Sequence, residues 1–268
     1  VILGIIQGLT EFLPVSSSGH LALTQRLMDL DPDTNALIVF GLAVHPGPPI
    51  AVAAVFAGQI RRFLTSLLGE VTDRRRRKRP AVRIAGLGII ACIPTAIIGV
   101  GFKDTLEAAF DKPVWIAGGL LVTGTLLWIT GRLARTRRGW RQFSGWRALI
   151  VGTGQGLAIF PGVSRSGTTI ALALMLGMKR AWAGEFSFLM AFPAICGAAL
   201  LKAKDVLDAG GESAQALLTG PLLVGTAAAT VTGYLALRLL LAAVRTARLH
   251  YFCYYCWALG AIVLLTLR

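Results

Sequence analysis

Residues 7–19 of the chain are QGLTEFLPVSSSG, and residues 155–167 are QGLAIFPGVSRSG. The two stretches align without a gap at an offset of 148 residues, and 8 of the 13 positions are identical. They differ in their chemistry, because the first contains Glu11 and is followed by His20, whereas the second contains Arg165 and is followed by Thr168. We interpret the pair as a duplicated element whose two copies have specialised for one shared site.

Each copy lies between two apolar pieces, and each piece is too short to cross a bilayer. A hydrocarbon core about 30 Å thick needs about 20 helical residues, and the Pro, Gly and Ser between the apolar pieces break a helix. The pieces are residues 1–13 and 19–28 around the first copy, and 148–160 and 168–178 around the second. We therefore expect two re-entrant helical hairpins with the repeated motif at each tip; the alternative is one kinked span at each place.

The composition is typical of a polytopic membrane protein. The 268 residues are 55% hydrophobic and 15% charged, and the mean hydropathy is +0.68. The net charge of +14 does not indicate nucleic-acid binding, because 19 of the 27 Lys and Arg residues lie in four short segments between apolar runs. These segments are 59–83, 132–147, 179–180 and 245–248. Such clustering is the positive-inside pattern, and it predicts that the four segments are cytoplasmic.

The hydropathy pattern predicts an all-α polytopic membrane protein with a single membrane domain, residues 1–268. Its expected spans are 36–58, 84–101, 114–131, 183–201, 221–244 and 251–267. Residues 1–131 and 148–268 then form two inverted-topology repeats, each a re-entrant hairpin plus three transmembrane helices, because an odd number of spans inverts the second half. Both termini and the links 103–112 and 202–220 would face outside, the basic loop from Arg61 to Arg83 would be cytoplasmic, and the two tips would meet near the midplane.

Both predicted tips have the features of an anion site. A Ser- and Gly-rich run before a short helix leaves backbone N–H groups without partners, and a helix N-terminus attracts negative charge. Two such tips facing each other, with Arg165 between them, would form a pocket for a multiply charged anion, and the planar guanidinium suits phosphate. The alternative interpretation is that the small residues only permit close packing and that Arg165 pairs with Glu11.

The first tip also contains candidate catalytic groups. Glu11 is an intramembrane carboxylate, and such groups are functional candidates by default. Gln7 lies four residues earlier on the same helical face, and the oxygens of both side chains suit Mg²⁺ or Ca²⁺ if a phosphate completes the coordination. His20 follows Ser17 by three residues, a spacing expected to bring the imidazole within hydrogen-bond reach of the hydroxyl as a general base or acid.

The C-terminal stretch HYFCYYCW, residues 250–257, contains a Cys-x-x-Cys pair. The dense aromatic residues around Cys253 and Cys256 are typical of the belt that lies at a membrane interface. We therefore interpret this stretch as an interfacial belt rather than a metal or redox site.

Four stretches resemble one known family. They are QGLTE at 7–11, FLPVSSSGH at 12–20, PGVSRSGTT at 161–169 and EFSFLMAFP at 185–193. With these motifs the chain resembles, over essentially its whole length, the undecaprenyl-diphosphate phosphatase family, bacterial membrane enzymes also known as bacitracin resistance proteins. Two features depart from the family pattern: Thr168 stands where a small residue such as alanine is common, and HPGPP at 45–49 is richer in proline.

The resemblance implies a hydrolase of the bacterial cytoplasmic membrane. Its expected reaction is hydrolysis of undecaprenyl diphosphate to undecaprenyl phosphate and phosphate, with Mg²⁺ or Ca²⁺ as cofactor and an active site open to the outer face. This reaction recycles the carrier lipid for peptidoglycan synthesis and confers bacitracin resistance. The alternative function is a transporter of the polyprenyl phosphate, since inverted repeats support alternating access. A homodimer is one oligomeric state that remains open.

By motif position, the resemblance also assigns roles to residues. Glu11 and Gln7 would be metal or diphosphate ligands, with Ser17 and His20 at the reacting phosphorus and Arg165 both catalytic and phosphate-binding. The remaining predicted phosphate-binding residues are hydroxyl side chains of the two tips: Ser16, Ser18, Ser164, Ser166, Thr168 and Thr169. The attacking group stays open among Ser17, His20 and metal-bound water; our preferred hypothesis is attack by Ser17.

Overall fold

The computed structural model describes residues 1–30, 46–72, 80–110, 112–133, 138–191, 197 and 220–267. Every regular element in these ranges is a helix, apart from an isolated bridge between Arg138 and Met178. The predicted all-helical class is therefore confirmed for the described part of the chain.

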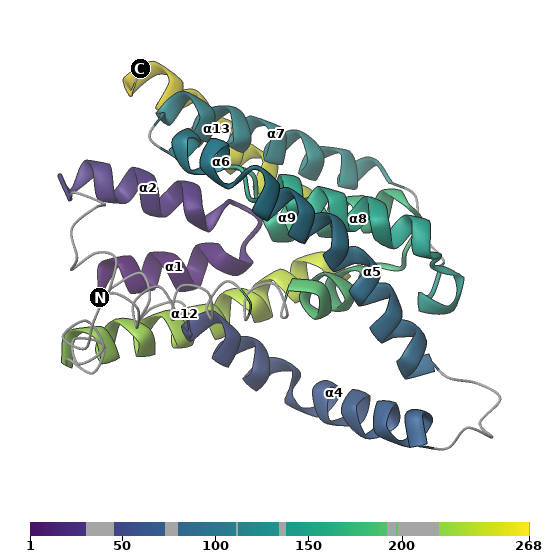
Figure 1. Cartoon of the computed structure of the whole chain (residues 1–268). Coiled ribbons are helices and arrows are strands. Elements are labelled where there is room, and N and C mark those ends of the chain that lie inside the picture. The colour runs from purple at the N-terminus through teal and green to yellow at the C-terminus, as the bar shows by residue number, and fades with distance from the viewer. Residues whose placement is uncertain are drawn as a thin grey trace.

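The first hairpin consists of α1 (Ile2–Phe12) and α2 (Ser17–Leu27), as Figure 1 shows. Helix α1 ends at Phe12, because Pro14 cannot continue it. Ser16 then adopts a left-handed φ of 70°, and its side chain accepts a hydrogen bond from the amide of Gly19 at 3.4 Å. The observed helices fall within a residue or two of the predicted apolar pieces.

The second hairpin consists of α8 (Gly145–Leu157) and α9 (Arg165–Met175). Ser164 caps α9 by accepting from the amide of Gly167 at 3.2 Å, at the position equivalent to Ser16 in the offset of 148. Gly162 in the tip has a φ of 82°, and a Cβ there would lie 2.0 Å from the carbonyl oxygen of Ile116, so no other residue fits.

The long helices are α4 (Gly47–Thr72), α5 (Pro80–Gly101), α7 (Pro113–Arg132), α12 (Gly220–Arg245) and α13 (Phe252–Thr266). With the 3-10 turn η2 (Leu249–Tyr251) preceding α13, the described residues contain five helices long and apolar enough to cross a membrane. Large apolar side chains of α5 face outward: Ile89, Ile97 and Val100 are 66%, 64% and 80% exposed. Such exposure suits a lipid environment, and the chain is a multi-pass membrane protein.

The predicted basic loop from Arg61 to Arg83 is wrong in its extent. Helix α4 continues to Thr72, because half of residues 61–72 are the good helix formers Arg, Leu and Glu, and α5 starts at Pro80, a residue favoured at the first helical position. Buried Glu70 joins the two helices by accepting from the amides of Ala81 and Val82 at 2.8 and 3.1 Å. The predicted link 103–112 is likewise mostly helical, as α6 (Lys103–Phe110). A second short turn, η1 (Trp140–Gln142), lies within the predicted basic segment 132–147.

Several sequence predictions concern residues outside the described ranges. These are the first part of the span 36–58 with His45, the run Arg74 to Arg79, the end of the span 183–201, and nearly all of the link 202–220. The chain is helical from residue 180 to residue 191, which includes the first part of the span predicted at 183–201.

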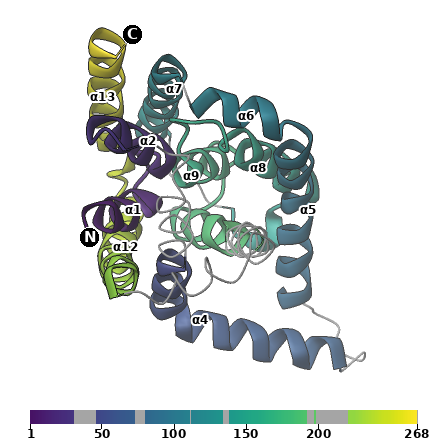
Figure 2. The same ribbon diagram turned by 60° about the vertical axis from the view of Figure 1, so that its left-hand side comes forward.

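Each hairpin packs its first helix along a long helix from the other half of the chain. In Figures 1 and 2, α1 lies beside α12 and α8 lies beside α5, while α7 and α13 pair. A Cβ on Gly4 would lie 2.4 Å from the carbonyl oxygen of Gly225, and one on Gly152 would lie 2.0 Å from that of Ala91. Gly4 and Gly152 are equivalent in the offset of 148, so the same small residue permits the same close packing in both halves.

Candidate active site

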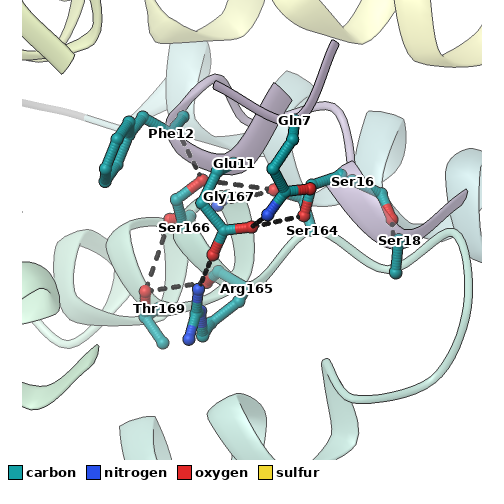
Figure 3. A network of polar contacts seen from close by, with 11 residues as sticks. Gln7, Glu11, Phe12, Ser16, Ser18, Ser164, Arg165, Ser166, Gly167 and Thr169 are labelled. Atoms are coloured by element: carbon teal, nitrogen blue, oxygen red, sulfur yellow. Dashed lines mark hydrogen bonds and ion pairs between the residues drawn. The ribbon is translucent and has the colours of Figure 1, made fainter. Parts of the chain in front are cut away.

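The tips of the two hairpins are in direct contact (Figure 3). The hydroxyl of Ser166, at the start of α9, donates to the carbonyl oxygen of Phe12, at the end of α1, at 2.9 Å. A Cβ on Gly167 would lie 3.2 Å from the Cβ of Pro14. Phe12 is buried against Phe188 with ring centroids 5.9 Å apart, which anchors the first tip in the core. The contact between tips agrees with the expectation of one shared site.

Glu11 is the centre of the polar network between the tips (Figure 3). Its Oε2 accepts from the hydroxyl of Ser17 at 2.7 Å and from the Nε2 of Gln7 at 3.1 Å. Its Oε1 forms an ion pair with the Nη2 of Arg165. One carboxylate thus connects a hydroxyl of the first tip to the cation of the second. Arg165 pairs with Glu11, as the packing interpretation expects. A guanidinium has five N–H donors, however, and the Arg165 side chain is 26% exposed, so Arg165 can also bind an anion.

Gln7 contributes a second oxygen beside Glu11. The residue is 5% exposed, and its Oε1 has no hydrogen-bond partner among the described residues. A buried acceptor without a partner is costly, and a hard cation or water would satisfy it. The described residues contain no group of three or more His, Cys, Asp or Glu that could hold a metal alone. The donor set therefore fits a divalent cation that takes most of its ligands from phosphate and water.

The hydroxyl groups of the two tips form equivalent pairs. The Oγ atoms of Ser16 and Ser18 lie 3.4 Å apart, and those of Ser164 and Ser166 lie 3.3 Å apart. In both tips the first serine of the pair also caps the helix, so the amides at the helix start and the hydroxyls are held together by the same local structure. These serines surround the network of Glu11 in Figure 3.

The two predicted threonines of α9 differ in the bonding of their hydroxyl groups. Thr169 is fully buried, and its hydroxyl is bonded to the carbonyl oxygen of Arg165 at 2.8 Å and to the Oγ of Ser187 at 2.5 Å. Thr168 is 5% exposed, and its hydroxyl has no partner among the described residues. Thr169 therefore joins α9 to the helix at 180–191, a packing contact that the spacing of the motif did not indicate.

The expected hydrogen bond between Ser17 and His20 is not formed. Ser17, at the first position of α2, points back to Glu11, whereas the imidazole lies toward α13. His20 Nδ1 lies 2.7 Å from the carbonyl oxygen of Ser16, and Nε2 lies 2.7 Å from the hydroxyl of Tyr255. Sequence reasoning missed Tyr255 because its stretch resembles an interfacial belt, and no local pattern relates it to a residue 235 positions away.

Comparison with known proteins shows that nearly the whole chain is similar to one family. The model of a family described as "Bacitracin resistance protein BacA" matches residues 1–262. A protein of Desulfosudis oleivorans is 42% identical over 271 residues, which cover 98% of this chain and 96% of the relative. A protein of Alkaliphilus metalliredigens is 41% identical, with 99% and 96% covered, and one of Carboxydothermus hydrogenoformans is 38% identical, with 98% and 95% covered. All three relatives are named undecaprenyl-diphosphatase.

Proposed function

The chain belongs to the bacitracin resistance protein BacA family, and from this premise we propose how its two tips dephosphorylate undecaprenyl diphosphate. The protein is a membrane phosphatase that converts undecaprenyl diphosphate to undecaprenyl phosphate and phosphate, and the family name connects this activity with bacitracin resistance. One observation carries the mechanism below: a single carboxylate, Glu11, is bonded both to the hydroxyl of Ser17 and to the guanidinium of Arg165.

In this mechanism Ser17 is the nucleophile and Glu11 is its base. Glu11 is the acceptor of the Ser17 hydroxyl proton at 2.7 Å, so it takes over the role that the sequence suggested for His20. The Ser17 oxygen bonds to the terminal phosphorus, and the bond from that phosphorus to the bridging oxygen breaks. Its electron pair leaves with undecaprenyl phosphate, while the serine proton passes to Glu11.

The second half of the reaction regenerates the serine. Glu11 first passes the serine proton to the departing undecaprenyl phosphate, so that its carboxylate is ionised again when water attacks the phosphoserine. Glu11 then takes a proton from this water and returns it to the Ser17 oxygen as the phosphorus–serine bond breaks and inorganic phosphate forms. The atoms balance with one water consumed for each phosphate released.

Arg165 and the tip serines hold the diphosphate in this scheme. The partly exposed guanidinium lies next to the carboxylate that activates Ser17, so its remaining N–H donors can make a two-pronged contact with the transferred phosphoryl group. The hydroxyls of Ser16, Ser18 and Ser164, together with the helix N-termini that they flank, supply further donors where negative charge develops. The Ser166 hydroxyl, which donates to Phe12, keeps the second tip against the first. Thr168, whose hydroxyl has no partner among the described residues, is a further candidate donor, whereas the Thr169 hydroxyl is bonded to Arg165 and Ser187 and supports the tip.

Gln7 and Glu11 are the proposed cation ligands. The partnerless Oε1 of Gln7 and the carboxylate beside it are oxygen donors of the kind that Mg²⁺ or Ca²⁺ takes, with substrate phosphate completing the coordination. When bound, the cation neutralises charge on the diphosphate oxygens.

We also propose that the two halves, residues 1–131 and 148–268 of one membrane domain, are inverted repeats. Three observations support this arrangement: the sequence duplication at an offset of 148, the matching caps by Ser16 and Ser164, and the exchanged packing of α1 on α12 and α8 on α5. In Figure 1 the open ends of the two hairpins lie on opposite sides of their meeting tips. We assign the protein to the bacterial cytoplasmic membrane, as the family resemblance implies, and the clustered basic segments favour an orientation in which the first hairpin and the active site open to the outer face.

Phosphate release from purified protein in detergent tests the proposed function. Detergent micelles have no two sides, so transport cannot produce a signal, whereas a phosphatase releases phosphate from undecaprenyl diphosphate. We expect release with added Mg²⁺ or Ca²⁺, its loss with excess chelator, and recovery when the cation is restored. Undiminished release in chelator would contradict the role of the cation, and no release under any condition would contradict the enzymatic mechanism.

A further inference from the structure

His20 and Tyr255 connect the first tip to the last helix of the chain. Tyr255 lies on α13 and is 48% exposed, and its hydroxyl lies 2.7 Å from Nε2 of His20. The two rings are also nearly parallel, with centroids 5.7 Å apart and an interplanar angle of 12°. A hydrogen bond and a ring contact together fix both the position and the plane of the imidazole.

The other imidazole nitrogen determines which proton the ring holds. Nδ1 lies 2.7 Å from the carbonyl oxygen of Ser16. A carbonyl oxygen only accepts, so Nδ1 is the nitrogen that bears hydrogen. In a neutral ring Nε2 is then an acceptor, and the Tyr255 hydroxyl donates to it. Tyr255 and Ser16 therefore favour the same tautomer from opposite edges of the ring.

The carbonyl group held by His20 belongs to a residue with unusual backbone geometry. Ser16 has φ 70° and ψ 98°, in the region that residues with a side chain rarely adopt, and its oxygen accepts from both the amide and the Nδ1 of His20. In the second tip Thr168 stands in place of His20, and the equivalent Ser164 has an ordinary φ of −79°. The unusual conformation thus occurs in the tip that has the imidazole.

We propose that Tyr255 is a positioning residue of the active site. It holds His20 in the Nδ1–H tautomer, and His20 in turn holds the carbonyl of Ser16 so that the next residue, Ser17, is directed at Glu11. The inference rests on the proposed role of Ser17, which is the group that benefits from the geometry. The proposal assigns a function to Tyr255, a residue of the stretch 250–257 interpreted above as an interfacial belt. It also gives His20 a role that needs no contact with Ser17.

Replacement Tyr255→Phe tests the proposal, because it removes the hydroxyl and keeps the ring. We expect kcat to fall about three- to tenfold, the effect of losing one hydrogen bond, while KM changes little. In a His20→Ala background the same replacement should have no further effect. Tyr254→Phe is the matched control, since the neighbouring Tyr254 packs against Trp257 on the same helix, and it should retain wild-type kcat.

Nitrogen-15 NMR of the imidazole supplies a readout that does not depend on activity. Histidine-labelled protein, with the His20 signal identified by its loss in His20→Gln, should show Nδ1 protonated in the wild type and a mixture of tautomers in Tyr255→Phe. Unchanged kcat and an unchanged tautomer in Tyr255→Phe would overturn the proposal, as would an equal loss of kcat in both backgrounds. A tautomer shift with unchanged kcat would retain the contact but refute its importance, and with it the proposed effect on Ser17.

Discussion

Replacement of Arg165 by lysine separates charge from geometry at the centre of the site. Arg165 pairs with Oε1 of Glu11 while its side chain remains 26% exposed, so one guanidinium serves the carboxylate and still presents N–H groups to an anion. A lysine ammonium is a point charge that can keep the ion pair but cannot also make a planar two-pronged contact with phosphate. We therefore expect Arg165→Lys to fold but to bind the transition state poorly.

The expected loss is about 100-fold in kcat/KM, which corresponds to about 2.7 kcal/mol of transition-state stabilisation. The assay is phosphate release in detergent over a range of substrate concentrations, combined with a thermal melt of each protein. Arg147→Lys is the matched control, because Arg147 lies at the far end of the same hairpin, where its guanidinium donates to the carbonyl oxygen of Gln142 at 2.8 Å. Near-normal kcat/KM in a folded Arg165→Lys protein would refute the two-pronged contact.

Three further predictions concern the cation site, the helix packing and the topology. Gln7→Leu should weaken the apparent affinity for Mg²⁺ or Ca²⁺ about tenfold in a cation titration of phosphate release, because it removes the partnerless oxygen; an unchanged titration curve would contradict this ligand. Gly152→Ala should lower the melting temperature clearly, because its Cβ would lie 2.0 Å from the carbonyl oxygen of Ala91, whereas Gly86→Ala, with no atom within 4 Å, should leave it unchanged or raised. A single cysteine at position 76, in a background without the native cysteines, should resist an impermeant maleimide added to sealed cells, and labelling from outside would invert the proposed topology.

The hairpins could be predicted from the sequence because their signals are local. Apolar pieces of about half the length that a span needs, separated by Pro, Gly and Ser, define two short helices wherever the rest of the chain lies. The duplication then predicted that the tips share one site, and the contact between Ser166 and Phe12 agrees with it. The extension of α4 to Thr72 does not follow from hydropathy, because charged residues such as Arg61 lower the hydropathy of a segment although arginine is a good helix former.

The partners of individual side chains could not be predicted in the same way. The spacing of Ser17 and His20 allows a contact, but the direction of each side chain depends on what packs against α2. The end of α1 supplies Glu11 to the hydroxyl, and α13 supplies Tyr255 to the imidazole. The depth of Thr169 depends likewise on Ser187, which comes from a different helix. Such partners are set by the packing of distant segments, which a motif does not encode.

A search for a phosphorylated intermediate tests the central claim, that Ser17 attacks the terminal phosphorus and accepts the phosphoryl group with Glu11 as its base. Substrate labelled in its terminal phosphate is mixed with enzyme and quenched in the millisecond-to-second range, and the labelled residue is located by peptide mapping. We predict label on Ser17 in the wild type, the same label formed more slowly in Glu11→Gln, and none in Ser17→Ala. Labelled protein that persists in Ser17→Ala would contradict attack by Ser17. So would turnover of Ser17→Ala at a substantial fraction of the wild-type rate, if neither Ser17→Ala nor the wild type gave labelled protein.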